Sequence, residues 1–396
     1  MSSPAIRFAG FTEDWEEREF ENLVSRVPSM AEGEPGLPSV EYEDIVSGQG
    51  QLNKNIYEKQ NNKRGIYFRP GDILFGKLRP YLQNWLAPNF TGIAVGDWWV
   101  LRPNDANSEF IYALIQSLKY QEVSNLTTGT KMPRSDWNIV SKTPFILPSE
   151  MAEQAKIGAT FCDLDRLITL HQREHDKTVN IKKALLEKML PKDGEDKPEI
   201  RFAGFTDAWE QRKLGDIASF SKGQGYSKGD LQEEGTPIIL YGRLYTKYET
   251  VISSVDTFVH AKENSVYSRG NEVIVPASGE TAEDIARAAV VEDAGILLGG
   301  DLNILHPHPI INPVFLALTI SNGERQKDLS KRAQGKSVVH IHNSDLQEVI
   351  LAYPSLDEQN KIGPLFRNFD RLLALHKREL TKLQNIKKAL LEKMFV

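Results

Sequence analysis

Two short segments of the chain resemble catalytic or cofactor-binding motifs, and both are incomplete. Gly335-Lys336-Ser337 matches the end of a phosphate-binding loop, but Ser330 stands where such a loop needs its first glycine. Asn312-Pro-Val-Phe315 resembles an adenine-methyltransferase motif without its second proline, and no glycine-rich cofactor loop follows a predicted strand. We therefore expect neither a nucleotide site nor methyl transfer within this chain.

The histidines and the single cysteine are the remaining candidates for special chemistry. His306 and His308, and likewise His340 and His342, each place two imidazoles on one face of an extended segment. No acidic or cysteine ligands accompany them at zinc-binding spacing, so a polar strand face or a DNA-facing loop is the favoured interpretation. Cys162 cannot form an internal disulfide, which places the chain in a reducing cytoplasm. The sequence predicts no catalytic residue, no metal site and no cofactor in this chain.

The composition is that of a globular protein whose charge is uneven. The chain has 396 residues, of which 40% are hydrophobic and 26% charged, and its net charge is −6. Between Glu13 and Asp44, eleven acidic residues and two arginines give a local charge of −9, which leaves +3 for the remainder. That remainder permits a DNA partner, and we expect the acidic stretch to face away from DNA. No apolar run approaches the roughly 18 residues of a membrane span, and no secretory signal opens the chain.

An internal duplication organises the whole chain. The segment Ile-Arg-Phe-Ala-Gly-Phe-Thr at 6–12 returns at 200–206, and the ten residues 180–189 return unchanged at 385–394. Each half therefore combines a variable block with a nearly invariant tail. We expect the two tails to do the same job, whereas the two blocks are free to do different ones.

The tails are predicted to be long helices that pair with each other. Strong helix formers dominate 150–189 and 357–394, and apolar residues recur there at steps of four and three. Gly363-Pro364 is expected to break the second helix and to open its longer part. We expect an antiparallel coiled coil that relates the halves by a pseudo-twofold axis, the alternative being a helix that lies on its own domain. The predicted seam residues are Ile157, Phe161, Leu164, Ile168, Leu185, Met189, Ile362, Phe366, Phe369, Leu373, Leu380, Leu383, Leu390 and Met394.

The fold class is predicted to be α/β (α+β), with two mixed domains joined by the long helices. Short strands are expected at 71–75 and 273–276, and helices at 110–118 and 314–320. A faint frame also aligns Pro38-Ser-Val-Glu-Tyr42 with residues 237–241. The predicted boundaries are 1–146 for the first variable domain, 147–191 for the first long helix, 192–199 for a charged linker, 200–352 for the second variable domain and 353–396 for the second long helix.

Cationic, aromatic and hydroxyl side chains gather in loops ahead of each tail. Lys77-Leu-Arg-Pro-Tyr81 follows a predicted strand, and the loop 127–134 has its counterpart at 331–337. Such side chains contact phosphates or read base edges, the alternative being ordinary solvated loops. The second block has no Lys-Leu-Arg-Pro-Tyr segment, which argues against the idea that both domains contact DNA through such a segment. The candidate DNA contacts are Lys77, Arg79, Tyr81, Lys131 and Arg134 in the first domain and Arg243, Lys336, Ser337, His340 and His342 in the second.

This arrangement resembles the DNA-specificity subunit of type I restriction–modification enzymes along essentially the whole chain. The resemblance is carried by Arg7-Phe-Ala-Gly-Phe-Thr-Glu-Asp-Trp15 and its second copy, by Gly71-Asp-Ile-Leu-Phe-Gly-Lys-Leu-Arg-Pro-Tyr81, and by Glu153-Gln-Ala-Lys-Ile-Gly158 with its counterpart at 358–363. It is also carried by the Leu-His-Gln-Arg and Leu-His-Lys-Arg tails that end in Leu-Leu-Glu-Lys-Met.

The resemblance implies the following function. Each variable block would be a target-recognition domain that reads one half of a bipartite, asymmetric site in double-stranded DNA. The paired helices would set the distance between the half-sites and help to dock two adenine-N6 methyltransferase subunits. S-adenosylmethionine, ATP and Mg would be bound by those subunits and by separate restriction/translocase subunits. The charged candidates for contacts between helices or subunits are Asp165, Arg166, Lys182, Lys183, Asp370, Arg371, Lys387 and Lys388.

Two other classes of function remain open from the residues alone. A duplicated scaffold whose variable domains bind two proteins would show the same repeat without affinity for specific DNA sequences. A self-sufficient enzyme such as a nuclease would act as the purified chain with a divalent metal.

Overall fold

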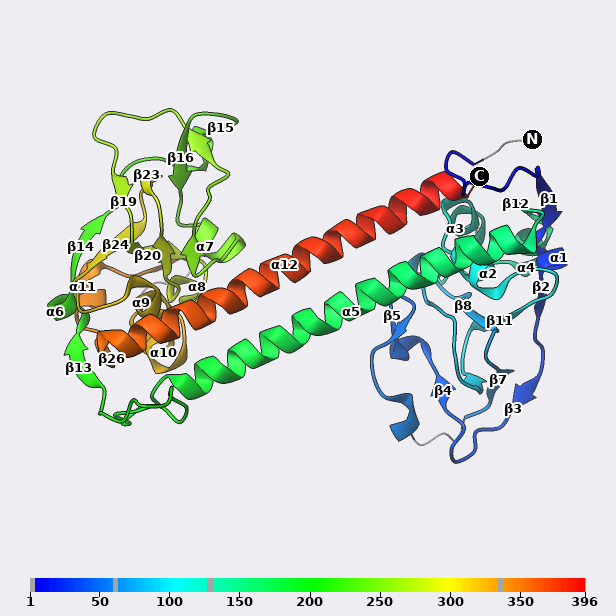
Figure 1. Ribbon diagram of the computed structural model, residues 1–396, viewed down its shortest axis with the longest axis horizontal. Coiled ribbons are helices and arrows are strands. Elements are labelled where there is room, and N and C mark those ends of the chain that lie inside the picture. The colour runs from blue at the N-terminus through cyan, green and yellow to red at the C-terminus, as the bar shows by residue number, and fades with distance from the viewer. Residues whose placement is uncertain (1–3, 60–62, 127–130, 334–337, 396) are drawn as a thin grey trace. The chain divides into compact units, whose positions relative to one another are not determined.

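The computed structural model describes residues 4–59, 63–126, 131–333 and 338–395, and the chain divides into two compact units (Figure 1). Unit 1 runs to Arg173 and includes the C-terminal segment from Arg378, whereas unit 2 is Glu174–Lys377. Each unit therefore contains one variable domain and one segment from each long helix. No helix in the described ranges is long and apolar enough to span a bilayer.

The variable domain of unit 1 is built on two four-stranded sheets. Their strand orders are β2-β11-β8-β9 and β3-β7-β10-β4, with β1-β12 and β5-β6 as separate pairs. The runs Ile-Leu-Phe in β8 and Trp-Trp-Val-Leu in β11 are buried throughout, as expected for β-branched and aromatic residues in central strands. The elements are β1 Trp15–Glu19, α1 Phe20–Leu23, β2 Val24–Arg26, β3 Met30–Ala31, β4 Ser39–Val40, β5 Ile45–Val46, β6 Gln51–Leu52, β7 Gly65–Phe68, β8 Ile73–Gly76, β9 Trp85–Leu86, β10 Gly92–Ala94, β11 Trp98–Pro103, α2 Ser108–Leu114, α3 Leu118–Ser124, α4 Trp137–Lys142 and β12 Pro144–Pro148.

The variable domain of unit 2 repeats this topology with two five-stranded sheets. The orders are β14-β24-β20-β22-β17 and β15-β18-β16-β23-β19, with β13-β26 and β21-β25 as pairs. Its elements are β13 Glu210–Lys213, α6 Leu214–Ile217, β14 Ala218–Lys222, β15 Leu231–Gln232, β16 Thr236–Ile239, α7 Arg243–Thr246, β17 Val251–Ile252, β18 Phe258–Val259, β19 Tyr267–Arg269, β20 Glu272–Pro276, β21 Ser278–Gly279, α8 Ala282–Ile285, β22 Ala289–Val291, β23 Ala294–Leu298, β24 Leu302–Pro307, α9 Pro313–Ile320, α10 Gly323–Arg332, β25 Val339–His340, α11 Asn343–Gln347 and β26 Ile350–Tyr353.

The two domains share one topology although their sequences diverge. The order β2-β11-β8-β9 matches β14-β24-β20-β22, and β7-β10-β4 matches β19-β23-β16. The strands β4 and β16 lie at the segments 38–42 and 237–241 that the sequence comparison aligns. Each forms a parallel pair, β4 with β10 and β16 with β23. The predicted mixed fold is thus confirmed, and the duplication extends through the variable blocks.

The long helices are α5 (Met151–Met189) and α12 (Leu356–Met394), each of 39 residues. Their bounds lie within one residue of the stretches 150–189 and 357–394, in which strong helix formers dominate. Among the fourteen predicted seam residues, Ile157, Phe161, Ile168, Met189, Ile362, Phe366, Leu380 and Met394 are buried, and the others are partly buried. In unit 1 the start of α5 and the end of α12 share one core with the domain, and in unit 2 the end of α5 and the start of α12 do so.

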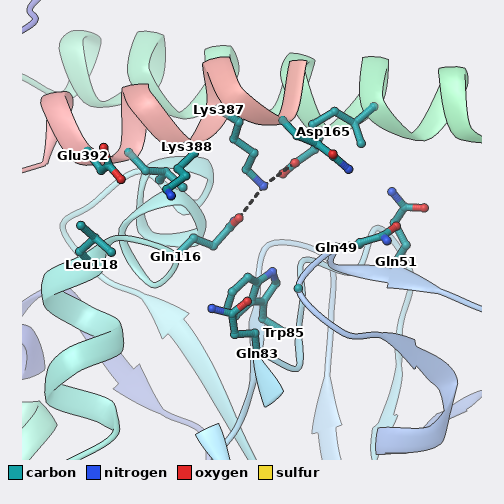
Figure 2. A pocket seen from close by; sticks show the side chains of 14 residues that line it. Gln49, Gln51, Gln83, Trp85, Gln116, Leu118, Asp165, Lys387, Lys388 and Glu392 are labelled. Carbon is teal, nitrogen blue, oxygen red and sulfur yellow. Dashed lines mark hydrogen bonds and ion pairs between the residues drawn. The ribbon is translucent and has the colours of Figure 1, made fainter. Parts of the chain in front are cut away.

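The helix segments pair antiparallel within each unit. In unit 1, Lys387 of α12 donates to Asp165 of α5 at 2.5 Å (Figure 2). In unit 2, Lys182 of α5 donates to Asp370 of α12. The two ion pairs occupy the same positions of the repeat with the helices exchanged, as a pseudo-twofold duplication requires.

The prediction that Gly363-Pro364 breaks the second helix is wrong, because α12 runs through Pro364. A proline within a helix loses one backbone hydrogen bond and costs about 3 kcal/mol. Here Gln359 on one side and Phe366 on the other are fully buried and hold both parts of the helix to the domain. Gly363 packs closely against the start of α9, where a Cβ would lie 3.3 Å from Asn312 Oδ1, a tight contact.

The two Ile-Arg-Phe-Ala-Gly-Phe-Thr segments fasten the long helices to each other. Arg7 binds Glu153 at the start of α5 through two hydrogen bonds of 2.7 and 2.8 Å, and the Ile6 N–H donates to the Lys393 carbonyl near the end of α12. In unit 2, Arg201 binds Glu358 in the same way, and the Ile200 N–H donates to the Lys188 carbonyl. The repeated segments are therefore structural clasps that join the two long helices within each unit.

Candidate nucleic-acid interface

In unit 1 the chain leaving β8 forms a short ribbon with the residues that precede α4. Leu78 pairs antiparallel with Arg134, the Arg79 N–H donates to the Pro133 carbonyl at 2.7 Å, and the Ser135 N–H donates to the Lys77 carbonyl at 2.8 Å. We name residues 77–81 and 131–135 ribbon 1. The structure thus brings together all five DNA-contact candidates of the first domain.

Asp97 and Tyr42 contact ribbon 1 through hydrogen bonds and ion pairs. Asp97 accepts from Arg134 at 3.0 Å and lies 3.5 Å from the Lys77 ammonium. Partial burial raises the pKa of Asp97, but the hydrogen bond and charge of Arg134, together with Lys77, hold it below its usual value. The Tyr42 hydroxyl donates to the Asp97 carbonyl at 2.5 Å and accepts from the Leu78 N–H at 3.0 Å. Lys77 and Arg134 are therefore anchored by this carboxylate.

Arg79, Tyr81 and Lys131 are exposed side chains of ribbon 1, as are Met132 and Arg134. Arg79 is exposed, and its guanidinium has no hydrogen bond or ion pair with any described residue. Its backbone is left-handed with φ 49°, a conformation that costs an ordinary side chain energy and is often found at binding sites. Tyr81 is 56% exposed. The ribbon therefore offers one unpaired guanidinium and one aromatic ring.

Unit 2 contains a ribbon at the equivalent place, formed by β21 and β25. Ser278 pairs with His340, and the Ile341 N–H donates to the Ala277 carbonyl just as Ser135 donates to Lys77. This register aligns Lys77 with Ala277, Arg79 with Gly279 and Arg134 with His340, so ribbon 2 has no cation at these three positions. His340 Nδ1 lies 3.0 Å from the Ser278 hydroxyl. Lys336 and Ser337 lie outside the described residues.

The other candidates of the second domain lie apart from ribbon 2 or serve local structure. Arg243 is 9% exposed and donates to Asp256 and Glu249 at 2.7 and 2.8 Å. Lys247 and Arg243 lower the pKa of Asp256 to about 2 through hydrogen bonds. His342 begins α11, where its N–H donates to Asp345 in a capping box. The structure places Arg243 in an ion-pair cluster and His342 at a helix cap.

The incomplete methyltransferase motif at 312–315 has a structural role, whereas Gly335-Lys336-Ser337 lies outside the described residues. Asn312 caps α9, its side chain accepting from the N–H groups of Val314 and Phe315, and Pro313 is the first helical residue. His306 lies 2.8 Å from the Ser221 hydroxyl. Within the described ranges, no group of three or more histidine, cysteine or acidic side chains could hold a metal. Burial raises the pKa of Cys162 to about 11, as expected for a packed thiol.

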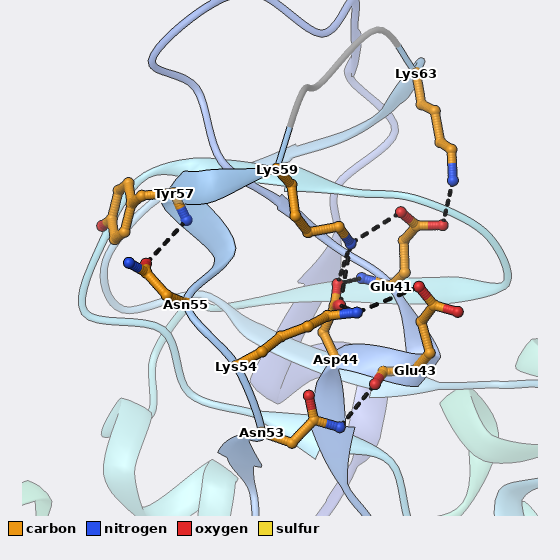
Figure 3. Close-up of polar contacts among 9 residues, drawn as sticks. All are labelled: Glu41, Glu43, Asp44, Asn53, Lys54, Asn55, Tyr57, Lys59 and Lys63. Atoms are coloured by element: carbon orange, nitrogen blue, oxygen red, sulfur yellow. Dashed lines mark hydrogen bonds and ion pairs between the residues drawn. The ribbon is translucent and has the colours of Figure 1, made fainter.

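Three acidic residues of the stretch, Glu41, Glu43 and Asp44, pair with lysines that lie later in the sequence (Figure 3). Asp44 is fully buried and accepts from Lys54 at 2.8 Å and Lys59 at 2.7 Å, while Lys63 donates to Glu41 at 2.6 Å. Burial raises the pKa of Asp44, but its hydrogen bonds to Lys54 and Lys59 outweigh that effect and lower it. The local charge of −9 is therefore partly compensated, at the C-terminal end of the acidic stretch.

The lysines of these ion pairs lie in and next to a polar segment, residues 53–59, that sequence analysis did not select as a DNA contact. Asn53, Asn55 and Tyr57 are exposed between the lysines of Figure 3, and Tyr57 is 64% exposed. Asparagine, lysine and tyrosine are typical of nucleic-acid contacts. The sequence feature that could have identified this segment is the composition of residues 53–64, which include asparagines, lysines and a tyrosine.

Comparison with known proteins defines the class. The family model for the type I restriction modification DNA specificity domain matches residues 36–179 and again 206–385. The type I restriction enzyme MjaVIII specificity subunit of Methanocaldococcus jannaschii is 21% identical over 291 residues, which cover 70% of this chain and 68% of that subunit. A putative MjaX specificity subunit of the same organism is 24% identical over 201 residues, which cover 47% of this chain and 45% of that one.

Solved structures share the fold. The S subunit of a type I restriction-modification system from M. genitalium gives a TM-score of 0.62 at 17% identity, covering 100% of this chain and 99% of that one. A chain from a structure described as the basis of complex assembly and conformational transition of the type I R-M system gives a TM-score of 0.50 at 19% identity, covering 96% and 97%.

The chain belongs to the type I restriction–modification DNA specificity family, as its sequence predicts. Proteins of this family are the non-catalytic specificity subunits of type I complexes, so DNA recognition within such a complex is the function of this chain. Membership also implies assembly with other subunits of the system.

Proposed function

We propose that this subunit binds double-stranded DNA through the two ribbons, each reading one half of a bipartite, asymmetric site. The observation that supports this is ribbon 1, where the unpaired Arg79 and the exposed Tyr81 lie on a turn that is hydrogen-bonded to Pro133, next to the Arg134–Asp97 ion pair. A two-stranded ribbon fits the major groove of B-DNA, and a guanidinium there donates two hydrogen bonds to guanine O6 and N7. Because ribbon 2 has Ala277, Gly279 and His340 instead, the two half-sites are expected to differ in sequence.

Arg79→Ala is expected to weaken binding to the cognate duplex by about 1–3 kcal/mol, or roughly 5- to 150-fold, because a bidentate base contact is lost. The cognate site is first obtained by methylome sequencing of cells that express the chain with its modification subunit. Affinity is then measured by gel-shift titration of the assembled complex at fixed salt. Sequence preference should relax at one base pair of one half-site.

Arg69→Ala is the matched control. Arg69 is also exposed and belongs to the same domain, but it precedes β8 and so lies at the other end of that strand from ribbon 1. It should change affinity by less than about 0.5 kcal/mol. Equal effects of the two substitutions would show that Arg79 adds only charge, and the absence of any sequence-dependent shift by the assembled complex would contradict DNA reading by this chain.

We further propose that two methyltransferase subunits dock on the long helices, with restriction/translocase subunits joining the complex. The exposed face of α5 formed by Lys177, Asn180, Ile181 and Ala184 has the same residues as Lys382, Asn385, Ile386 and Ala389 of α12. Two identical faces on otherwise different domains support one partner bound twice. The S-adenosylmethionine, ATP and Mg sites are placed in those partners, and the complex in the cytoplasm.

Ile181→Glu with Ile386→Glu is expected to abolish copurification of the methyltransferase subunit, because a charge replaces an apolar contact on both faces. Either substitution alone should leave one copy bound, as measured by native mass spectrometry. Lys183→Glu, an exposed position of α5 outside this face, is the control. Unchanged stoichiometry in the double variant would move the docking site elsewhere.

A further inference from the structure

The carboxylate Asp97 beside ribbon 1 has a counterpart beside ribbon 2, Asp301. The Asp97 carbonyl accepts from the Lys77 N–H at 3.0 Å, and the Asp301 carbonyl accepts from the Ala277 N–H at 2.7 Å. Each aspartate also comes directly before the strand that pairs with the strand leading into its ribbon, β11 with β8 and β24 with β20. The duplication therefore places an aspartate at the same position beside both ribbons.

The surroundings of the two carboxylates differ. Asp97 is paired with Lys77 and Arg134, whose nitrogens lie 3.5 and 3.0 Å from its oxygens. The backbone register puts an alanine and a histidine at these two positions of ribbon 2. Asp301 is exposed, and its carboxylate has no hydrogen bond or ion pair with any described residue. Ribbon 2 therefore retains the carboxylate but lacks the lysine and the arginine that neutralise it in ribbon 1.

His340, which occupies the position of Arg134, does not replace it as the partner of the carboxylate. Its Nδ1 lies 3.0 Å from the Ser278 hydroxyl of the facing strand, so this nitrogen is engaged within ribbon 2. Between the described residues His340 and Asp301 there is no hydrogen bond or ion pair. Glu280, at the tip of ribbon 2, is also exposed and has no ion pair within the described ranges. The described part of ribbon 2 thus offers hydrogen-bond acceptors where ribbon 1 offers cations.

Backbone contacts hold Asp301 at a defined place between β23 and β24. Its backbone is left-handed, with φ 58°, a conformation that aspartate and asparagine adopt more readily than most residues. The Gly299 N–H donates to the Ile239 carbonyl at 3.0 Å. The Gly300 N–H donates to the Gly225 carbonyl at 2.6 Å. The turn that carries the carboxylate is therefore fastened to two neighbouring segments of the domain.

We propose that Asp301 reads a cytosine in the half-site that unit 2 contacts. The inference rests on the proposed function, because it requires ribbon 2 to lie in the major groove. A carboxylate there is repelled by the phosphates and by guanine O6 and N7 and thymine O4, which are all acceptors. The amino group N4 of cytosine is the donor that an aspartate accepts from. Adenine also has an amino group, but its neighbouring N7 repels the second carboxylate oxygen. Attraction and repulsion together select cytosine.

The test uses the assembled complex and its methylated site, which methylome sequencing provides. Affinity is measured by gel-shift titration at fixed salt for duplexes in which each base pair of the site is changed in turn. The wild-type complex is expected to prefer cytosine over thymine by roughly 5- to 150-fold at one position. Asp301→Asn should lower this preference to about threefold or less, because an amide both donates and accepts. Asparagine also tolerates the left-handed backbone, so the turn should be retained.

Asp293→Asn is the matched control. Asp293 is exposed and precedes β23, whereas Asp301 follows it, so the two residues lie at opposite ends of that strand. The control removes the same charge and should leave every base preference unchanged. Ala277→Lys combined with His340→Arg is the converse variant. It restores the two cations of ribbon 1 beside an intact Asp301, and it should also abolish the preference for cytosine.

The outcomes separate this inference from the proposed function, because Arg79→Ala is measured on the same duplexes. If Arg79→Ala relaxes one base pair and Asp301→Asn changes none, the role of Asp301 is overturned while DNA reading by ribbon 1 stands. Loss of the cytosine preference in Glu280→Gln but not in Asp301→Asn would assign it to the tip and overturn the inference. An A·T pair at the position that Asp301→Asn relaxes would also overturn it. If neither Arg79→Ala nor Asp301→Asn changes any base preference, reading by both ribbons is overturned.

Discussion

Arg201→Ala is expected to lower the free energy of unfolding by about 3–5 kcal/mol, because it leaves a buried carboxylate without its partner. Glu358, whose side chain is 1% exposed, accepts from Arg201 at 3.0 and 2.6 Å. The same guanidinium also donates to the Asp207 carbonyl at 2.7 Å. Urea unfolding of the purified chain, followed by near-ultraviolet circular dichroism, measures the loss.

A second ion pair of unit 2 provides the control. Arg212 and Glu210 lie 3.0 Å apart, but their side chains are 51% and 63% exposed. Solvent screens such a pair, so Arg212→Ala should cost less than about 1 kcal/mol. Arg201→Ala combined with Glu358→Leu should regain much of the loss, since no charge is then buried. If Arg201→Ala costs no more than Arg212→Ala, the clasp does not hold the helix pair.

The motifs that recur in both halves and carry the family resemblance prove to be structural, which is why the fold was predictable from them. In Glu153-Gln-Ala-Lys-Ile-Gly158, Glu153 binds the clasp arginine and Gln154 accepts from the Asn107 N–H. Ile157 is buried, and a Cβ at Gly158 would lie 2.5 Å from the Phe110 nitrogen. The contacts of the glutamate, the glutamine and the isoleucine recur in the second half at Glu358, Gln359 and Ile362, so spacing and periodicity reveal them without a structure.

The proposed DNA-contact surface was less predictable, because it depends on tertiary contacts between distant segments. Sequence analysis selected Lys77 and Arg134 by type, but only the structure shows that Asp97 anchors both and leaves Arg79 unpaired. Arg243 looked like a free cation until the structure showed it between Asp256 and Glu249. The register that aligns ribbon 1 with ribbon 2 comes from backbone pairing, which the diverged sequences do not display.

Lengthening both long helices is expected to change the DNA site that is methylated. Both α5 and α12 pass without interruption between segments assigned to unit 1 and segments assigned to unit 2. One heptad inserted in each preserves the phase of the apolar seam and adds about 10 Å of helix. That is roughly three base pairs at ~3.4 Å each. Methylation of the original sites should fall to background in methylome sequencing, with the half-sites unchanged and the gap longer.

The twist of DNA sharpens this prediction. Three added base pairs turn one half-site by roughly 100° relative to the other, since a helical turn has about 10–10.5 base pairs. A seam-preserving heptad supplies little matching rotation, so methylation at the new sites should be weak. Three heptads add about 32 Å, close to the ~34 Å of a full DNA turn, and should restore strong methylation with a gap about ten base pairs longer. An insertion of seven residues into the linker 192–199, outside both helices, is the control and should leave the gap unchanged. Only a rigid helix pair that sets both the distance and the rotation between the half-sites predicts that strong methylation is lost with one heptad and recovered with three. If the gap between the half-sites stays constant in all three variants, another part of the complex sets the spacing.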